Sequence, residues 1–379
     1  MHEPVYLDYA ATTPLRTPVR EAMLAVLGDR WGNPSSVHRW GREARAVLED
    51  ARARFAAVVG ASPAEIVFTR GGTEADNLAV LGRGRADGSR TAAVSAIEHK
   101  AVLASAKALA ADGGTVRTIP VDADGRVDLD ALAETVRADR PAVVSVMWAN
   151  NEVGAVQPVE QVAAICAEAG VAFHTDAVQA LGKLPVRLDA VPVALAAFSA
   201  HKLGGPRGTG ALFVRRGTQL HPLLYGGGQE RGLRSGTEDV AGAVGFAVAA
   251  ELAEAERETV MARIGVLRDR LEAGLCERVP GLRVNAAAAP RLATISNVSA
   301  PGADAEMLLM ALDLEGVAAS SGSACSSGAV EPSHVLTAMG LPADVAGPSV
   351  RFSLGRETTE ADIDRALQVF PAVVERLRS

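Results

Sequence analysis

The run AVVSVMW at residues 142–148 decides the fold, because seven consecutive uncharged residues fit a strand that is buried on both faces. Similar short runs recur through the first half of the chain. They are IVFT at 66–69, TAAVSAI at 91–97, VRTIPV at 116–121, VAFHTD at 171–176, ALAAFS at 194–199 and GALFVR at 210–215. Strands that do not alternate apolar with polar residues are typical of a mostly parallel sheet covered by helices.

Helical stretches lie between these runs. Residues 128–137 begin at Asp128, which is a favourable N-cap, and residues 159–169 follow Pro158, which suits a first helical turn. The repeated order of strand and helix predicts an α/β fold for the first half of the chain.

The second half of the chain has a different pattern. Residues 241–278 indicate a long helix with a brief glycine interruption. Short strands then follow near residue 283 and at 293–298, 316–319 and 350–354, with helices at 303–314 and from about 358 onward. Because the regular alternation is lost, we expect a smaller α+β layer here.

Composition excludes several classes of protein. The 379 residues carry 38 Lys and Arg against 45 Asp and Glu, a net charge of −7, which does not favour direct nucleic-acid binding. The three cysteines show neither metal-finger nor disulfide spacing, which favours a reducing cytoplasm. A secretory leader and a membrane span are not expected, because no uncharged apolar run reaches about 18 residues.

Polar residues follow the predicted strands directly. They are His99, Asn150 with Asn151, Asp176 with Gln179, and Ser199 with His201 and Lys202. Each of them alone is more often a turn residue, a cap or a structural histidine. Because ligands gather at the carboxyl ends of parallel strands, their joint occurrence indicates one crevice that holds all of them.

Two features of this crevice suggest a coenzyme. Gly71–Glu74 follows a strand and begins a helix, which suits a phosphate, although a turn without a ligand is the simpler reading. Lys202 stands before the loop GGPRGTG and could form a Schiff base if its pKa fell by about three units. Together with a carboxylate at Asp176 for a pyridinium proton, these groups describe pyridoxal phosphate.

Ten strings spread over the whole chain resemble the cysteine desulfurases of the NifS/IscS type, within the class V aminotransferase superfamily. They are YLDYAATTP at 6–14, NPSSVH at 33–38, GGTEADN at 71–77, EHKAVL at 98–103, NNEVG at 150–154, HTDAVQALGK at 174–183, SAHKLGGPRGTGALFVR at 199–215, GGGQERGLRSGT at 226–237, SSGSACSSG at 320–328 and RFSLGR at 351–356. Ten strings in the same order make the resemblance specific.

The resemblance implies a pyridoxal-phosphate enzyme of fold type I that works as a homodimer. It would convert L-cysteine to L-alanine and keep the sulfur as a persulfide on its own cysteine. We therefore expect a large coenzyme-binding domain at 15–255. Residues 1–14 with 256–379 would form a small domain that carries the catalytic loop, at about 320–332.

The resemblance also implies roles around the coenzyme ring. Lys202 would form the Schiff base and shuttle protons, and His99 would stack on the ring and assist acid and base steps. Asp176 would contact the pyridine nitrogen and Gln179 the ring hydroxyl side, with Asn151 nearby.

Further roles concern the phosphate and the substrate. The predicted phosphate contacts are Gly72, Thr73, Ser199 and His201, joined by Thr237 from the partner subunit. Arg351, with Asn33, would bind the substrate carboxylate, because an arginine fork suits that group.

Cys325 is the predicted nucleophile toward the substrate sulfur. Its neighbours in SSGSACSSG are small and polar, which predicts a mobile, exposed loop that could carry sulfur outward. Cys166 and Cys276 stand in apolar helical contexts, so we expect both to be buried and structural.

Two other readings remain open. The same scaffold could serve an aminotransferase or a lyase acting on selenocysteine or kynurenine, and only Cys325 with its loop argues against this. A silent scaffold of a sulfur relay is the second alternative. For the desulfurase, the expected acceptor is an iron–sulfur scaffold or a tRNA-thiolating enzyme.

Overall fold

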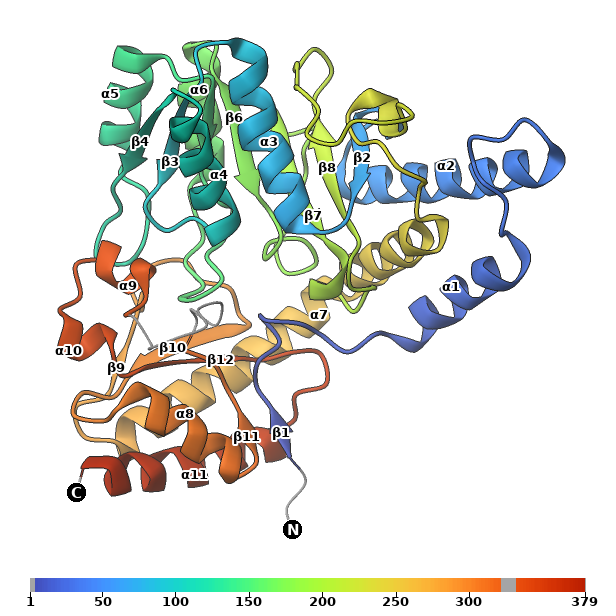
Figure 1. Ribbon diagram of the computed structural model, residues 1–379. Coiled ribbons are helices and arrows are strands. Elements are labelled where there is room, and N and C mark those ends of the chain that lie inside the picture. The colour runs from blue at the N-terminus through green and yellow to red at the C-terminus, as the bar shows by residue number, and fades with distance from the viewer. Residues whose placement is uncertain (1–3, 322–331, 379) are drawn as a thin grey trace.

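A seven-stranded sheet forms the centre of the first half of the chain (Figure 1). The computed structural model describes residues 4–321 and 332–378. In spatial order the strands are β2 (Ile66–Thr69), β8 (Gly210–Val214), β7 (Leu195–Ser199), β6 (Ala172–Asp176), β5 (Val143–Ser145), β3 (Thr91–Ser95) and β4 (Thr115–Ile119). β8 runs antiparallel to both of its neighbours, and the other pairings are parallel. The predicted mostly parallel sheet is confirmed.

Burial along the strands follows their place in the sheet. Every residue of the central strands β5 and β7 is buried, as their unbroken apolar sequence predicted. The edge strand β4 instead exposes Thr115, Arg117 and Thr118, because it has a strand on one side only.

Helices cover both faces of this sheet. On one face lie α3 (Gly72–Asp87) and α4 (Lys100–Ala111). The core of the other face includes residues of α1 (Thr17–Asp29), α2 (Arg39–Val59), α5 (Leu129–Asp139), α6 (Val159–Glu168) and α7 (Val240–Arg278). The predicted N-cap Asp128 is confirmed, since its Oδ1 accepts hydrogen bonds of 3.0 Å from two N–H groups of the first turn of α5.

Helix α7 joins the two halves of the protein. It runs for 39 residues, and the glycine interruption predicted from the sequence is absent. Its residues up to Ala250 belong to the core of the large sheet, whereas Ile264 and later residues belong to a second core. A division near residue 255 would therefore fall inside one continuous helix, and that division stays a prediction.

The second core lies against a small antiparallel sheet. Its strand order is β12 (Ser349–Ser353), β10 (Ile295–Ser299) and β9 (Arg283–Val284). A separate parallel pair joins β1 (Val5–Tyr6) to β11 (Val317–Ala318), so the N-terminal residues lie beside the C-terminal half (Figure 1). The helices here are α8 (Ala305–Leu314), α9 (His334–Ala338), α10 (Ala343–Ala346) and α11 (Glu360–Arg378).

The two described cysteines differ in burial. Cys166 is fully buried on α6, and burial raises the pKa of its thiol to about 12. The expected burial of Cys276 is wrong, because this side chain is exposed on α7. Leu271 and Leu275 take the buried face of that helix, and the next residue turns about 100° away from it. Among the described residues, no helix combines the length and apolar character that a membrane crossing requires.

Candidate functional site

A cavity of about 420 Å³ opens at the carboxyl ends of the parallel strands. Ten of the predicted site residues line it: Gly72, Thr73, His99, Asn151, Asp176, Gln179, Ser199, His201, Lys202 and Arg351. The chain thus brings together residues from the large sheet and from strand β12 of the small sheet.

Three predicted residues are not among those that line the cavity. Asn33 is exposed, and its Oδ1 accepts a 2.9 Å hydrogen bond from the N–H of Ser35. Thr237 is also exposed, and its expected role depends on a partner subunit. Cys325 lies outside the described residues.

Lys202 reaches the cavity from a tight turn. Strand β7 ends at Ser199, and the short 3₁₀ helix η2 (Ala200–Lys202) begins at the next residue. The Nζ of Lys202 donates hydrogen bonds to the carbonyl oxygens of Ala10 (2.6 Å) and Ala11 (2.7 Å). The N-terminal segment therefore holds the amine at the cavity wall.

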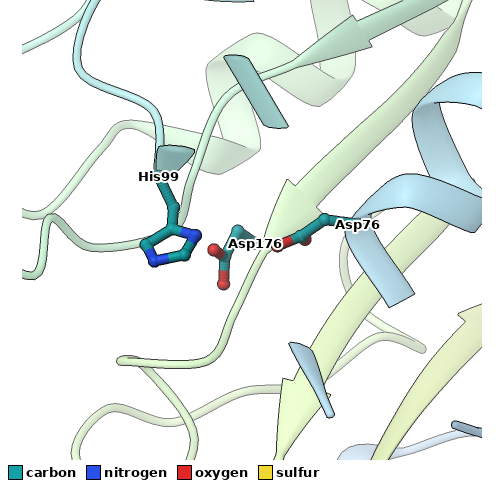
Figure 2. A group of neighbouring side chains, drawn as sticks. All are labelled: Asp76, His99 and Asp176. Carbon is teal, nitrogen blue, oxygen red and sulfur yellow. The ribbon is translucent and has the colours of Figure 1, made fainter. Parts of the chain in front are cut away.

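Asp176, His99 and Asp76 converge on one another (Figure 2) and line the same cavity as Lys202. One side-chain atom from each residue, a ring nitrogen of His99 or a carboxylate oxygen of Asp76 and Asp176, lies within 4.8 Å of the other two. Asp176 ends strand β6 and its Oδ1 accepts a 2.9 Å hydrogen bond from the N–H of Val178. Burial raises the pKa of Asp176, and the charges of His99 and Lys202 oppose that rise.

Asp76 is a site residue that the sequence analysis missed. It lies on α3, is 1% exposed, and its Oδ1 has no hydrogen-bond partner among the described residues. Burial, followed by the charge of Asp176, raises the pKa of Asp76 well above its usual range. The sequence did contain a signal for its burial. Asp76 stands beside Ala75 and Ala79 on a helix face that is otherwise apolar.

Buried polar groups support this cluster from behind. The Nε2 of His174 lies 3.5 Å from Oδ1 of Asp76, and its Nδ1 lies 2.9 Å from Oγ of Ser145. Ser145 in turn donates to Glu98. Burial lowers the pKa of His174 to about 3 and raises the pKa of Glu98 to about 7. His174 is therefore neutral at neutral pH, and so contributes no positive charge beneath Asp76.

The start of α3 has the form of an anion cradle. Gly71 precedes the helix with φ 128° and makes no side-chain capping bond, which leaves N–H donors of the first turn for a ligand. A Cβ on Gly72 would come within 2.8 Å of Val178 Cγ2, so only glycine fits this close approach. His201 lines the same cavity, and burial lowers its pKa to about 4, which keeps its ring neutral at neutral pH.

Arg351 lines the cavity from strand β12 of the small sheet. Its guanidinium donates to Oδ1 of Asp8 at 2.7 Å and to the carbonyl of Asn151 at 2.9 Å. The arginine is 3% exposed, and its Nε has no hydrogen-bond partner among the described residues. A small carboxylate that entered the cavity would meet this fixed cation.

Comparison with known proteins identifies the family. A family model described as aminotransferase class-V matches residues 5–366. A protein of Gluconacetobacter diazotrophicus named cysteine desulfurase is 47% identical, over 99% of this chain and 94% of its own. The chain belongs to the cysteine desulfurases of the class-V aminotransferase family. The resemblance drawn from the ten sequence strings is confirmed.

Other relatives agree with this placement. The cysteine desulfurase IscS of Dictyoglomus turgidum is 44% identical, over 100% of this chain and 96% of its own. A solved structure of a NifS-like protein has a TM-score of 0.92 at 38% identity, and the match covers 99% of this chain and 100% of that one. The predicted fold type I is therefore confirmed at the level of the whole chain.

Enzymes of this family depend on pyridoxal phosphate, and the cavity fits that coenzyme. The buried carboxyls of Asp76 and Asp176, which share the cavity with the amine of Lys202, suit a ring that carries a proton. The start of α3, where only glycine fits at position 72, suits the phosphate. Two carboxylates and an imidazole could also hold a divalent cation, but the amine and the glycine cradle around them favour the coenzyme.

Proposed function

We propose that this chain is a pyridoxal-phosphate-dependent cysteine desulfurase, which converts L-cysteine to L-alanine and stores the sulfur on Cys325 as a persulfide. One observation carries the proposal. A single cavity holds the amine of Lys202, the buried acid of Asp176 and the guanidinium of Arg351. Of the two flanks of the Cys325 segment, one lines this cavity at His334 and the other pairs at Ser320 with Arg351.

The flanks of that segment are placed by specific contacts. Ser320 forms an antiparallel bridge with Arg351, with N–H to carbonyl distances of 3.2 and 2.6 Å. His334, on the other flank, lines the cavity, and its Nε2 lies 3.0 Å from the carbonyl oxygen of Glu98. This arrangement supports Cys325 over Cys166 and Cys276, which lie on α6 and α7 and line no part of the cavity.

Proton transfer is divided between two side chains. The coenzyme, when bound, supplies an electron sink for the bonds at the substrate Cα. Nζ of Lys202 would hold the coenzyme and, once displaced by the substrate, take the Cα proton. The Nδ1 of His99 accepts a 3.1 Å hydrogen bond from the N–H of Ala101, so Nε2 is the ring nitrogen that carries a proton. His99 can then donate at Nε2 in the cavity.

Sulfur transfer requires a thiolate. The sulfur of Cys325 forms an S–S bond with the substrate sulfur while the substrate C–S bond breaks. The electron pair of the broken bond, with a proton delivered in the cavity, completes the methyl group of alanine. Arg351 would hold the substrate carboxylate at a fixed distance from Lys202 during this step.

The assembly and the acceptor belong to the same proposal. We infer a homodimer in which Thr237 of one subunit completes the phosphate site of the other, and Asn33 assists substrate binding. The persulfide would pass to an iron–sulfur scaffold or a tRNA-thiolating enzyme in the cytoplasm. The division into domains at 15–255, and at 1–14 with 256–379, is part of this proposal, with α7 as the shared element.

The test compares cysteines in the purified holoenzyme. With L-cysteine and a thiol reductant, we expect equal amounts of alanine and sulfide. Cys325→Ala should lose at least about 10²-fold in this rate while still binding the coenzyme, because the acceptor sulfur is gone. The exposed control Cys276→Ala should keep the full rate. Full activity of Cys325→Ala would refute the persulfide on Cys325, and a protein that binds no pyridoxal phosphate would refute the whole assignment.

A further inference from the structure

Lys183 makes a contact that no role above has used. It follows Gln179 by four residues, and its Nζ donates a 2.6 Å hydrogen bond to Oε1 of that glutamine. Gln179 is 4% exposed and lines the coenzyme cavity. Lys183 lines a second cavity on the other side of this contact, together with Arg16 and Glu256. The hydrogen bond therefore crosses the partition between the two cavities.

The partners of Gln179 determine which way its amide points. A lysine ammonium can only donate hydrogen bonds, and a backbone carbonyl can only accept them. Oε1 of Gln179 must therefore face Lys183, and Nε2 must face the carbonyl of Ala10, to which it donates at 2.9 Å. With both ends assigned, the second N–H of Nε2 is the donor that Gln179 can offer to a ligand.

The same carbonyl connects this contact to the reactive amine. The oxygen of Ala10 accepts from Nζ of Lys202 at 2.6 Å as well as from Gln179. Burial, followed by the charge of Lys202, lowers the pKa of Lys183 to about 7. A poorly solvated ammonium depends strongly on the acceptors that it has, and Gln179 is such an acceptor.

We propose that Lys183 is a positioning residue that fixes the amide of Gln179, so that Nε2 donates to the phenolic oxygen of pyridoxal phosphate. This inference rests on the proposed place of Gln179 at the coenzyme ring. Without the ammonium, only the carbonyl of Ala10 still orients the amide, so the amide is held less firmly and can turn its oxygen toward an oxygen of the ring. Lys183 thus sets the donor pattern around the coenzyme without touching it.

The experiment is a double-mutant cycle on the holoenzyme. Lys183→Met, Gln179→Ala and the double variant are compared for the rate of pyridoxal-phosphate release on dialysis and for the pH midpoint of the bound coenzyme's absorbance change. We expect Lys183→Met to speed release about tenfold and to shift that midpoint, since a hydrogen bond to a charged group is lost. When Gln179 is already alanine, adding Lys183→Met should raise the rate of pyridoxal-phosphate release less than twofold further. Lys183→Arg, which keeps a donor, should stay within about threefold of the original protein.

Two controls separate the possible failures. Arg16→Met removes another cation of the second cavity and should leave release unchanged, because in the part of the chain that the structure describes Arg16 pairs with Glu256 and makes no hydrogen bond to Gln179. If Lys183→Met does not fold, Lys183→Gln, whose amide can present oxygen or nitrogen, should show the same loss in part. Equal effects of Lys183→Met with and without Gln179 would overturn the inference. Unchanged release in Gln179→Ala would instead refute the proposed place of Gln179.

Discussion

The two walls of the coenzyme cavity differ in how their charges are compensated. On the large-sheet wall, formed by Asp176, His99, Asp76 and Lys202, Oδ1 of Asp76 has no hydrogen-bond partner among the described residues and the pKa of both buried acids is raised. On the small-sheet wall, Arg351 is already paired with Asp8 at 2.7 Å. The first wall holds buried acids whose ionisation a cationic ligand would favour, and the second holds a charge that is oriented in advance.

This difference assigns different tasks to the walls. The raised pKa values show that ionising the buried acids costs more free energy in the protein than in water. A cationic ring beside the ionised acids would offset that cost. An arginine held by an existing ion pair loses little conformational entropy on binding a carboxylate. The large-sheet wall therefore suits a resident coenzyme and the small-sheet wall suits a substrate that must leave again.

The largest effect is expected on the large-sheet wall. Lys202→Ala should lower the rate of alanine formation at least about 10³-fold, because both the proposed covalent anchor and the proposed base are removed. The rate is measured with purified protein, L-cysteine and reductant. Lys107→Ala, an exposed lysine of α4, is the control and should match the original protein. Substantial activity in Lys202→Ala would mean that the amine has no part in the chemistry.

A smaller effect is expected on the small-sheet wall. Arg351→Ala should reduce kcat/KM for L-cysteine about 10²-fold, mainly through KM, because charge-assisted hydrogen bonds to the carboxylate are lost. Asp8→Asn keeps an acceptor oxygen beside the arginine and should change KM by no more than about threefold. A fall in kcat with an unchanged KM in Arg351→Ala would remove the distinction between the two walls.

The support behind the large-sheet wall predicts a pH effect on stability. The pKa of Glu98 is about 7 in the folded protein, above its usual value of about 4.5, so the folded state binds the extra proton. The contribution of Glu98 to the free energy of unfolding is complete below about pH 4.5, and it is lost as the pH rises to about 7. At 1.36 kcal/mol per unit, that loss amounts to about 3 kcal/mol.

Glu98→Gln should remove this part of the pH dependence. Urea unfolding at pH 5 and pH 8 measures the free energy of unfolding. From pH 5 to pH 8 this free energy should fall by about 3 kcal/mol less in the variant than in the original protein. Glu258→Gln, an exposed carboxylate of α7, should show no such difference. If Glu98→Gln and the original protein lose the same stability, Glu98 does not titrate in this range.

The strand ends of the large sheet were predictable because local sequence carries their information. Asp176 and Ser199 end their apolar runs and Lys202 comes three residues after Ser199, and parallel strands must bring those ends to one edge. The burial of Asp76 and its approach to His174 were not predictable in this way. They depend on how α3 packs on the sheet, and no pattern within either segment sets that contact.

The small-sheet wall shows the same limit more strongly. Arg351 pairs with Asp8, which is 343 residues away in the chain, and the orientation of Gln179 depends on the carbonyl of Ala10. Backbone carbonyls are identical at every position, so their use as ligands leaves no trace in the amino-acid code.

The amino-acid sequence by itself determined the layered α/β architecture, the family and ten residues of the cavity, because burial patterns and reactive side chains are local properties of the chain. The tertiary structure alone decided which charges are compensated, which acids keep their protons and how each amide is turned. Those properties depend on distances between segments that are remote in sequence and on the exclusion of water around them.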